Sequence, residues 1–117
     1  MMHFIDPRYS STALSNLLPS VVARLDGEPP VIELPEAKQY VVLLVDGLGF
    51  HQLKQYRDHA ETMADLLDRA QRLTCSVPST TSTSLTSLGC GATPGEHGVM
   101  GYSFYEPTVD AVVNALS

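Results

Sequence analysis

The chain has 117 residues, enough for one small domain, and its hydrophobic content of 44% supplies a core and argues against intrinsic disorder. The formal net charge of −6 excludes a general binder of nucleic-acid polymers, because such a protein needs a basic surface to displace counterions from phosphates. No apolar run approaches the roughly 20 residues that span a bilayer, and the N-terminus lacks the basic and apolar blocks of a signal peptide. The sequence therefore predicts a cytoplasmic protein with no membrane partner.

The first predicted element is helical and covers residues 10–25. Its apolar residues are spaced alternately three and one apart, which places them on one stripe of a helix. Pro19 falls inside the stripe and removes a backbone donor, so we expect a kink or two short helices that meet there. Residues 26–39 are rich in proline and charge and predict an extended connection. The stripe consists of Leu14, Leu17, Leu18, Val21, Val22 and Leu25.

Strands and helices are then predicted to alternate. Residues 40–45 form a continuous apolar run rich in β-branched side chains, which is typical of a strand covered on both faces in a parallel sheet. Residues 50–71 predict a helix, and residues 73–77 predict a second short strand. This order favours an α/β fold with helices on both faces of the sheet. The inward face of the helix is predicted to consist of Met63, Leu66, Leu67 and Ala70.

The two cysteines, Cys75 and Cys90, are too few and too far apart in sequence to form a zinc knuckle. We interpret them as reduced, buried thiols, since free cysteine behaves as a small apolar residue. Their pattern does not indicate a redox function.

Asp46 directly follows the first predicted strand. It would therefore lie at the carboxyl end of a parallel sheet, where open α/β sheets bind their ligands. A structural alternative is equally open, in which Asp46 caps the next helix or forms a turn with Gly47. Gly47 and Gly49 also follow a strand as in a dinucleotide-binding loop, but Gln52 stands where that motif has its third glycine.

The second candidate is the hydroxyl-rich stretch SVPSTTSTSLTSLGCG, residues 76–91. A flexible linker would lack its flanking strand and its spaced leucines, so we expect a turn followed by a short helix from Thr81 that ends at Gly89 and Gly91. A hydroxyl in the first helical turn faces unpaired backbone N–H groups, which stabilise an alkoxide and bind anions such as phosphate. The alternative is an ordinary helix cap at Ser79 or Thr80.

Considered together, the two segments predict a shared site. Two strand ends that meet at one edge of a sheet would bring an aspartate and a hydroxyl together, and both groups can bind the same divalent metal. Such a metal lowers the pKa of the hydroxyl and turns it into a nucleophile near neutral pH.

The segments VVLLVDGLGF and VPSTTSTSLTSLGCGATPGEHGVMGY resemble the alkaline phosphatase superfamily, and most closely its nucleotide pyrophosphatase/phosphodiesterase branch. The resemblance covers about residues 40–105. It implies an α/β fold with a mostly parallel sheet flanked by helices. Residues 1–117 would be the N-terminal portion of a single alkaline phosphatase-like domain. It also implies a small phosphate-ester or nucleotide substrate.

The resemblance assigns functions to individual residues. Members of this branch hold two zinc ions with three aspartates and three histidines, and the first of these aspartates corresponds to Asp46. The nucleophile corresponds to Thr81, with Thr80 as the nearest rival. Thr81 would also contact the metal and would form a phosphothreonine that water then hydrolyses. His97 corresponds to a residue that shapes the turn after the nucleophile helix without binding metal. Tyr102 stands where these diesterases carry a phosphate-binding asparagine, so its phenol is the expected substrate contact.

The expected ligand set is incomplete in this sequence. Two more aspartates and three histidines are expected downstream, but Asp110 is the only such residue after Tyr102. We therefore expect a truncated domain that alone neither holds two metals tightly nor turns over substrate. A cofactor-independent phosphoglycerate mutase is the alternative within the superfamily, although those enzymes use a serine nucleophile. A non-catalytic fold fragment or binding module is the alternative outside it.

Overall fold

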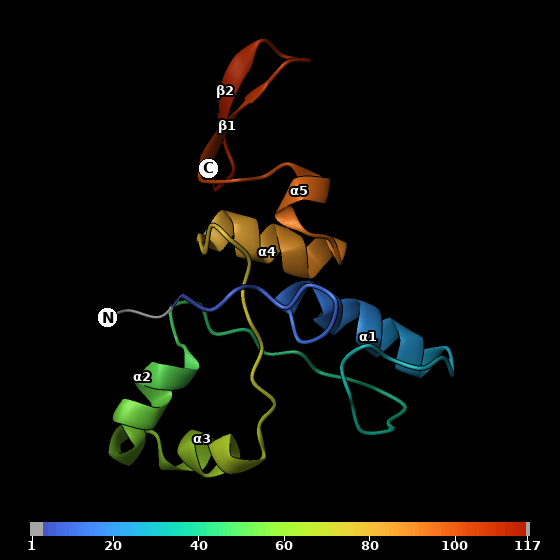
Figure 1. Ribbon diagram of the computed structural model, residues 1–117, viewed down its shortest axis with the longest axis vertical. Coiled ribbons are helices and arrows are strands. Elements are labelled where there is room, and N and C mark those ends of the chain that lie inside the picture. The colour runs from blue at the N-terminus through green and yellow to red at the C-terminus, as the bar shows by residue number, and fades with distance from the viewer. Residues whose placement is uncertain (1–3, 117) are drawn as a thin grey trace. The chain divides into compact units, whose positions relative to one another are not determined.

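The computed structural model describes residues 4–116 and divides the chain into two compact units. The middle unit is Val41–Arg72. The second unit, here called the α4 unit after the helix that begins at Thr81, holds the described residues up to Tyr40 and from Leu73 onward. Figure 1 labels the helices and strands of both units. Within residues 4–116, no helix has both the length and the apolar character needed to span a bilayer.

The first predicted helix forms as two consecutive short elements. A 3₁₀ turn, η1 (Leu14–Asn16), leads directly into α1 (Leu17–Leu25). The prediction of two short helices is confirmed, but they meet before Pro19. This proline is the third residue of α1, in the first turn, where a backbone N–H has no partner within the helix. It therefore fits without breaking a hydrogen bond.

The predicted helix after the hydroxyl-rich turn is confirmed as α4 (Thr81–Cys90). It ends at Gly91, which adopts the left-handed conformation with φ 65°. Gly89 is the penultimate helical residue and does not end the helix. A short second helix, α5 (Pro94–His97), follows and ends at Gly98, again with positive φ. Glycine suits both helix ends because it has no Cβ to clash in this conformation.

The second predicted strand is reduced to a single parallel β-bridge between Ala13 and Thr74. The Thr74 N–H donates to the carbonyl of Thr12 at 2.8 Å, and the Leu14 N–H donates to the carbonyl of Thr74 at 2.8 Å. The remainder of residues 73–77 is extended but forms no regular ladder. This bridge ties the start of η1 to the segment that leads into α4.

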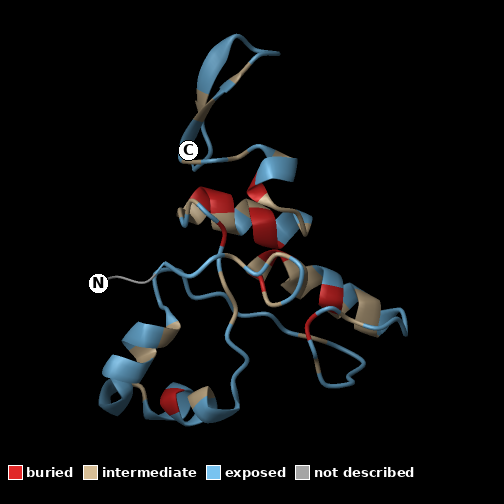
Figure 2. Ribbon diagram, viewed as in Figure 1, coloured by how far each residue is buried: buried red, intermediate tan, exposed pale blue. Residues whose placement is uncertain are grey.

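The core of the α4 unit is unusually rich in hydroxyl side chains. Figure 2 shows buried residues on α4, on α1 and on the segment that enters α4. Hydrogen bonds compensate for the burial of several of these polar groups, for example the bond that Ser20 Oγ accepts from the Ile32 N–H at 2.9 Å. The buried polar residues of this unit are Ser15, Ser20, Ser76, Ser82, Thr83 and Ser87. Its buried hydrophobic residues are Ala13, Ile32 and Leu88.

An antiparallel hairpin that the sequence did not predict follows α5. It consists of β1 (Ser103–Glu106) and β2 (Ala111–Asn114), with Ser103 opposite Asn114. Asp110 at the end of the connecting turn has φ 50°, a conformation that aspartate tolerates better than most residues. The hairpin is the only sheet within the described residues.

The middle unit is helical after residue 49, but the single helix predicted there is divided. It forms α2 (Phe50–Gln55), η2 (Arg57–His59), α3 (Glu61–Leu66) and η3 (Leu67–Arg69). The predicted inward face is wrong, because Met63, Leu66 and Ala70 are exposed and Leu67 is half-buried. Ala64 is the buried residue of α3. An amphipathic face stays exposed when its unit supplies no surface to cover it, which explains the difference.

Residues 41–45 belong to no helix or strand, in contrast to the predicted buried strand. Their side chains are exposed, with Val41 at 96% and Leu43 at 85%. Their backbone makes no hydrogen bond within the described part of the chain. The mostly parallel sheet therefore stays a prediction.

The cysteine prediction is half right. Cys75 and Cys90 are free thiols, but both are exposed rather than buried. Cys75 neighbours Ser76, whose hydroxyl takes the inward position, and Cys90 is the last residue of α4.

Candidate functional site

Thr81 is the first residue of α4 and is half-buried. The adjacent Thr80 has extended backbone angles and is the helix cap: its Oγ1 accepts a hydrogen bond from the Thr83 N–H at 3.4 Å. The same oxygen lies 2.8 Å from Thr83 Oγ1. Thr80 therefore fills the capping function that the sequence left open between Ser79 and Thr80, while Thr81 occupies the first helical turn.

Burial separates the other hydroxyls of the stretch into two groups. Thr83 and Ser87 are 0% exposed, Ser76 is 1% exposed and Ser82 is 3% exposed. Ser79, in contrast, lies on the surface. A hydroxyl without solvent access cannot meet a substrate, so the inward-facing residues have structural functions. Sequence reasoning treated the stretch as one hydroxyl-rich run and did not separate these groups.

His97 links the end of α5 to α4. Its Nε2 lies 2.8 Å from Ser87 Oγ, and its Nδ1 accepts a hydrogen bond from the Val99 N–H at 3.1 Å. Ser87 Oγ in turn accepts a hydrogen bond from Ser76 Oγ at 2.7 Å. These contacts agree with the prediction that His97 is structural. No signal in the sequence pointed to Ser76 and Ser87 as its partners.

The turn between α4 and α5 is held by Glu96. One carboxylate oxygen accepts hydrogen bonds from the backbone N–H of Thr93 at 2.7 Å and from its hydroxyl at 2.8 Å. These two bonds stabilise the ionised carboxylate and lower the pKa of Glu96. The TPGEHG segment is therefore a locally stabilised helix start, and its acidic group is already engaged.

Asp46 lies in the middle unit, in an exposed turn before α2. Its Oδ1 accepts a hydrogen bond from the backbone N–H of Gly47 at 3.0 Å, and Gly47 has φ 74°. This matches the turn alternative considered for Asp46. The cap of α2 is Gly49 instead. Asp46 and Thr81 belong to different units, so their closeness stays a prediction.

Tyr102 lies between α5 and β1, and its side chain is exposed. Its backbone carbonyl accepts a hydrogen bond from the Ala115 N–H at 2.7 Å, which closes the open end of the hairpin. The phenol has no hydrogen-bond partner among residues 4–116 and is available to a ligand. A second tyrosine, Tyr105, differs because its hydroxyl donates to Asp110 Oδ1 at 2.5 Å. That bond raises the pKa of Tyr105.

No three histidine, cysteine, aspartate or glutamate side chains within the described part of the chain gather closely enough to hold a metal ion. A carboxylate at Asp46 and a hydroxyl at Thr81 are oxygen donors of the kind that zinc accepts. These two residues therefore fit part of a zinc site, and the two-zinc site stays a prediction.

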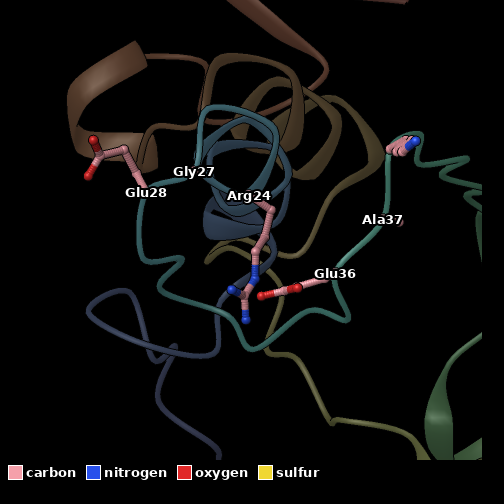
Figure 3. A pocket seen from close by; sticks show the side chains of 6 residues that line it. Arg24, Gly27, Glu28, Glu36 and Ala37 are labelled. Atoms are coloured by element: carbon pink, nitrogen blue, oxygen red, sulfur yellow. The ribbon is translucent and has the colours of Figure 1, made fainter.

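The α4 unit also has cavities away from these residues. One of about 430 Å³ lies beside the end of α1, where Figure 3 shows the side chains of Arg24 and Glu36 pointing toward one another. Arg24 also donates to the Leu34 carbonyl at 3.1 Å and pairs with Glu33 at 3.6 Å. Another, of about 550 Å³, lies between residues 4–9, Val77 and the start of α5. Neither is lined by Asp46, Thr81 or Tyr102.

Comparison with known protein families identifies the chain. A sequence model of the family described as type I phosphodiesterase / nucleotide pyrophosphatase matches residues 40–116. The chain belongs to this family. Searches of curated proteins and of solved structures found no match.

Membership in the type I phosphodiesterase / nucleotide pyrophosphatase family confirms the resemblance that the two sequence motifs indicated. The matched region contains Asp46, Thr81 and Tyr102. It also contains the whole of α4 and the hairpin. The family match supports a phosphate-ester hydrolase.

Proposed function

We propose that the chain forms part of a metal-dependent phosphodiesterase or nucleotide pyrophosphatase that uses Thr81 as its nucleophile. The observation that carries the proposal is the family match over residues 40–116, which includes a threonine at the first turn of α4. The substrate is a small phosphate ester or a nucleotide. We keep the cytoplasm as the proposed compartment.

The choice of Thr81 over its neighbours is supported by hydrogen bonding and burial. Thr80 Oγ1 already caps α4 and lies beside Thr83 Oγ1. Ser82 and Thr83 are buried, which removes them from solvent. Thr81 is half-buried at the helix start, where backbone N–H groups and the helix dipole favour a developing negative charge.

Two zinc ions are expected at the site. We propose that Asp46 and Thr81 both bind one of them. The ion would lower the pKa of the Thr81 hydroxyl and neutralise charge on the phosphate. This requires residues 40–45 and 73–77 to be strands of a mostly parallel sheet whose carboxyl ends meet. The exposed apolar side chains and unpaired backbone of residues 41–45 support a strand that gains partners in that sheet.

The proposed reaction has two displacements at phosphorus. Thr81 Oγ loses its proton to solvent and forms a bond to phosphorus, while the bond between phosphorus and the leaving oxygen breaks and that oxygen takes a proton from water. Thr81 then carries the phosphoryl group with its remaining ester. Water attacks this phosphorus, the bond between phosphorus and the Thr81 oxygen breaks, that oxygen takes a proton from the attacking water, and a phosphate monoester is released. Tyr102 donates a hydrogen bond to a phosphate oxygen, a function that its exposed phenol can fill.

We also propose that the remaining zinc ligands come from residues outside this chain. The 117-residue chain is then expected to bind zinc weakly and to hydrolyse no phosphodiester, whereas a longer protein that carries the missing aspartates and histidines does both. Tight binding of two zinc ions by the short chain would contradict this part of the proposal. Equilibrium dialysis against zinc makes the comparison.

The nucleophile is tested by hydrolysis of a chromogenic aryl phosphodiester in the zinc-loaded longer protein. We expect Thr81→Ala to lower kcat by about a thousandfold or more, because removal of a nucleophile abolishes the covalent route. Thr81→Ser retains a hydroxyl and is the conservative control. Thr80→Ala weakens the helix cap beside Thr81 and should lower kcat far less than Thr81→Ala does. Full activity in Thr81→Ala would reject the assignment, and loss only in Thr80→Ala would move the nucleophile by one residue.

A further inference from the structure

We propose that His97 is a positioning residue, which acts through Ser87 and Ser76 on the segment that leads into Thr81. The inference rests on the proposed function, because it assigns a purpose to the position of Thr81. The sequence led us to expect that His97 only shapes its own turn. Here we propose in addition that His97 connects this turn to residues 76–80.

The hydrogen bonds around His97 determine its tautomer. The Val99 N–H donates to Nδ1 at 3.1 Å, so Nδ1 has no proton. Nε2 therefore carries the proton and donates to Ser87 Oγ at 2.8 Å. Ser87 Oγ also accepts from Ser76 Oγ at 2.7 Å, so it receives two hydrogen bonds at once.

The hydrogen bonds that join His97, Ser87 and Ser76 are costly to break because these groups are buried. Ser76 and Ser87 are inaccessible to solvent, and His97 is half-buried. A buried hydroxyl that loses its partner has no water to replace it, so removal of the His97 donor leaves Ser87 with one fewer hydrogen bond. The cost is avoided only if Ser87 or Ser76 moves.

Movement of Ser76 would be transmitted to the proposed nucleophile. Ser76 holds one end of residues 76–80, and the Thr80 cap holds the other end at the start of α4. Val77 is fixed between them by a hydrogen bond from its N–H to the Tyr9 hydroxyl at 3.1 Å. Residues 76–80 are therefore bonded to α4 at both of their ends, and their geometry determines where the first turn of α4 begins.

Two substitutions of His97 separate the positioning function from a turn-shaping function. His97→Gln keeps an N–H donor that can reach Ser87 but offers no acceptor near Val99. His97→Asn offers an acceptor at the place of Nδ1 but cannot reach Ser87. The positioning proposal predicts that the Gln variant keeps kcat within about threefold, whereas the Asn variant loses about tenfold, as expected for one hydrogen bond. KM should change little in either variant.

A second pair of variants lies within α4. Ser87→Ala is expected to lower kcat like His97→Asn, because it removes the group that joins His97 to Ser76. Ser84→Ala is the matched control, since Ser84 lies one turn earlier and its hydroxyl makes no hydrogen bond within the described residues. Ser84→Ala should leave kcat unchanged.

Two readouts do not depend on turnover. Imidazole nitrogen NMR shifts should identify the Nε2–H tautomer of His97, and amide hydrogen exchange at Val77 should be faster in His97→Asn than in His97→Gln. An Nδ1–H tautomer, or equal exchange in the two variants, would overturn the proposal. If no form of the longer protein hydrolyses phosphodiesters, the proposed function fails, and exchange at Val77 still decides whether His97 positions the segment.

Discussion

Replacement of Gly91 by alanine tests how closely α1 approaches the end of α4. A Cβ at Gly91 would lie 2.6 Å from Pro19 Cγ and 3.3 Å from Pro19 Cδ. The proline ring can change its pucker but cannot swing away from the backbone, so α1 or α4 must shift. Gly91 also has φ 65°, where any L-residue is strained.

The two effects can be estimated separately. The left-handed conformation costs an alanine about 1–2 kcal/mol, and overpacking costs about 1–3 kcal/mol. Gly91→Ala should therefore lower the free energy of unfolding by about 2–5 kcal/mol. Gly98 has φ 76° but open space around it, so Gly98→Ala should show only the conformational cost of about 1–2 kcal/mol. Gly89 lies in the helix with open space, and Gly89→Ala should stabilise by about 0.5–1 kcal/mol.

Urea unfolding followed by circular dichroism measures all three variants. A double-mutant cycle with Pro19→Ala isolates the contact, because removal of the ring should reduce the cost of Gly91→Ala to that of Gly98→Ala. If Gly91→Ala costs no more than Gly98→Ala in the native background, the close approach of Pro19 to α4 is refuted.

Three further predictions concern caps and titrating groups. Thr80→Ala should destabilise the α4 unit by about 1 kcal/mol through loss of the helix cap, measured by urea unfolding, whereas Thr80→Ser should not. Because the folded pKa of Glu96 is lowered below 4.5, its stabilising contribution is present above that value and is lost as the pH falls through the lowered folded pKa; Glu96→Gln should remove this part of the pH profile of stability. Asp110→Gly should lower the pKa of Tyr105 toward 10.0 in an alkaline absorbance titration, and an unchanged pKa would contradict the hydrogen bond as its cause.

Elements with local determinants could be predicted from the sequence. The start of α4 follows from a threonine cap, and its end follows from Gly91 in a left-handed conformation. The division of residues 10–25 was also predicted, but its position was not. Pro19 was expected to interrupt the helix, whereas a proline in the first turn is compatible with it.

Elements that depend on distant partners could not be predicted. The apolar run at residues 41–45 has the composition of a buried strand, but a strand forms only when another strand accepts its hydrogen bonds. The periodicity of residues 50–71 predicted helix correctly, yet Met63 and Leu66 are exposed. Hydrophobic periodicity indicates which face can be buried, but not whether a surface is there to cover it.

The candidate site, like the fold, could be predicted only in part from the sequence. The motif pointed to the hydroxyl-rich turn and to Thr81, and the family match covers both. The spacing of serines and threonines did not indicate which of them face inward, because Ser82 and Thr83 are buried by packing that the sequence does not display. His97 is linked to the hydroxyls of Ser87 and Ser76, which lie 10 or more residues away in the sequence and belong to no recognisable motif.

The hydroxyl-rich core of the α4 unit has a thermal consequence. Exposure of apolar surface raises the heat capacity on unfolding, whereas exposure of polar surface lowers it. A unit that buries serines and threonines beside few large aliphatic side chains should therefore unfold with a smaller heat-capacity increment per residue than a domain with a leucine and valine core. The curve of its unfolding free energy against temperature is accordingly flatter. Cooling should therefore destabilise this unit less than it destabilises a domain with an aliphatic core.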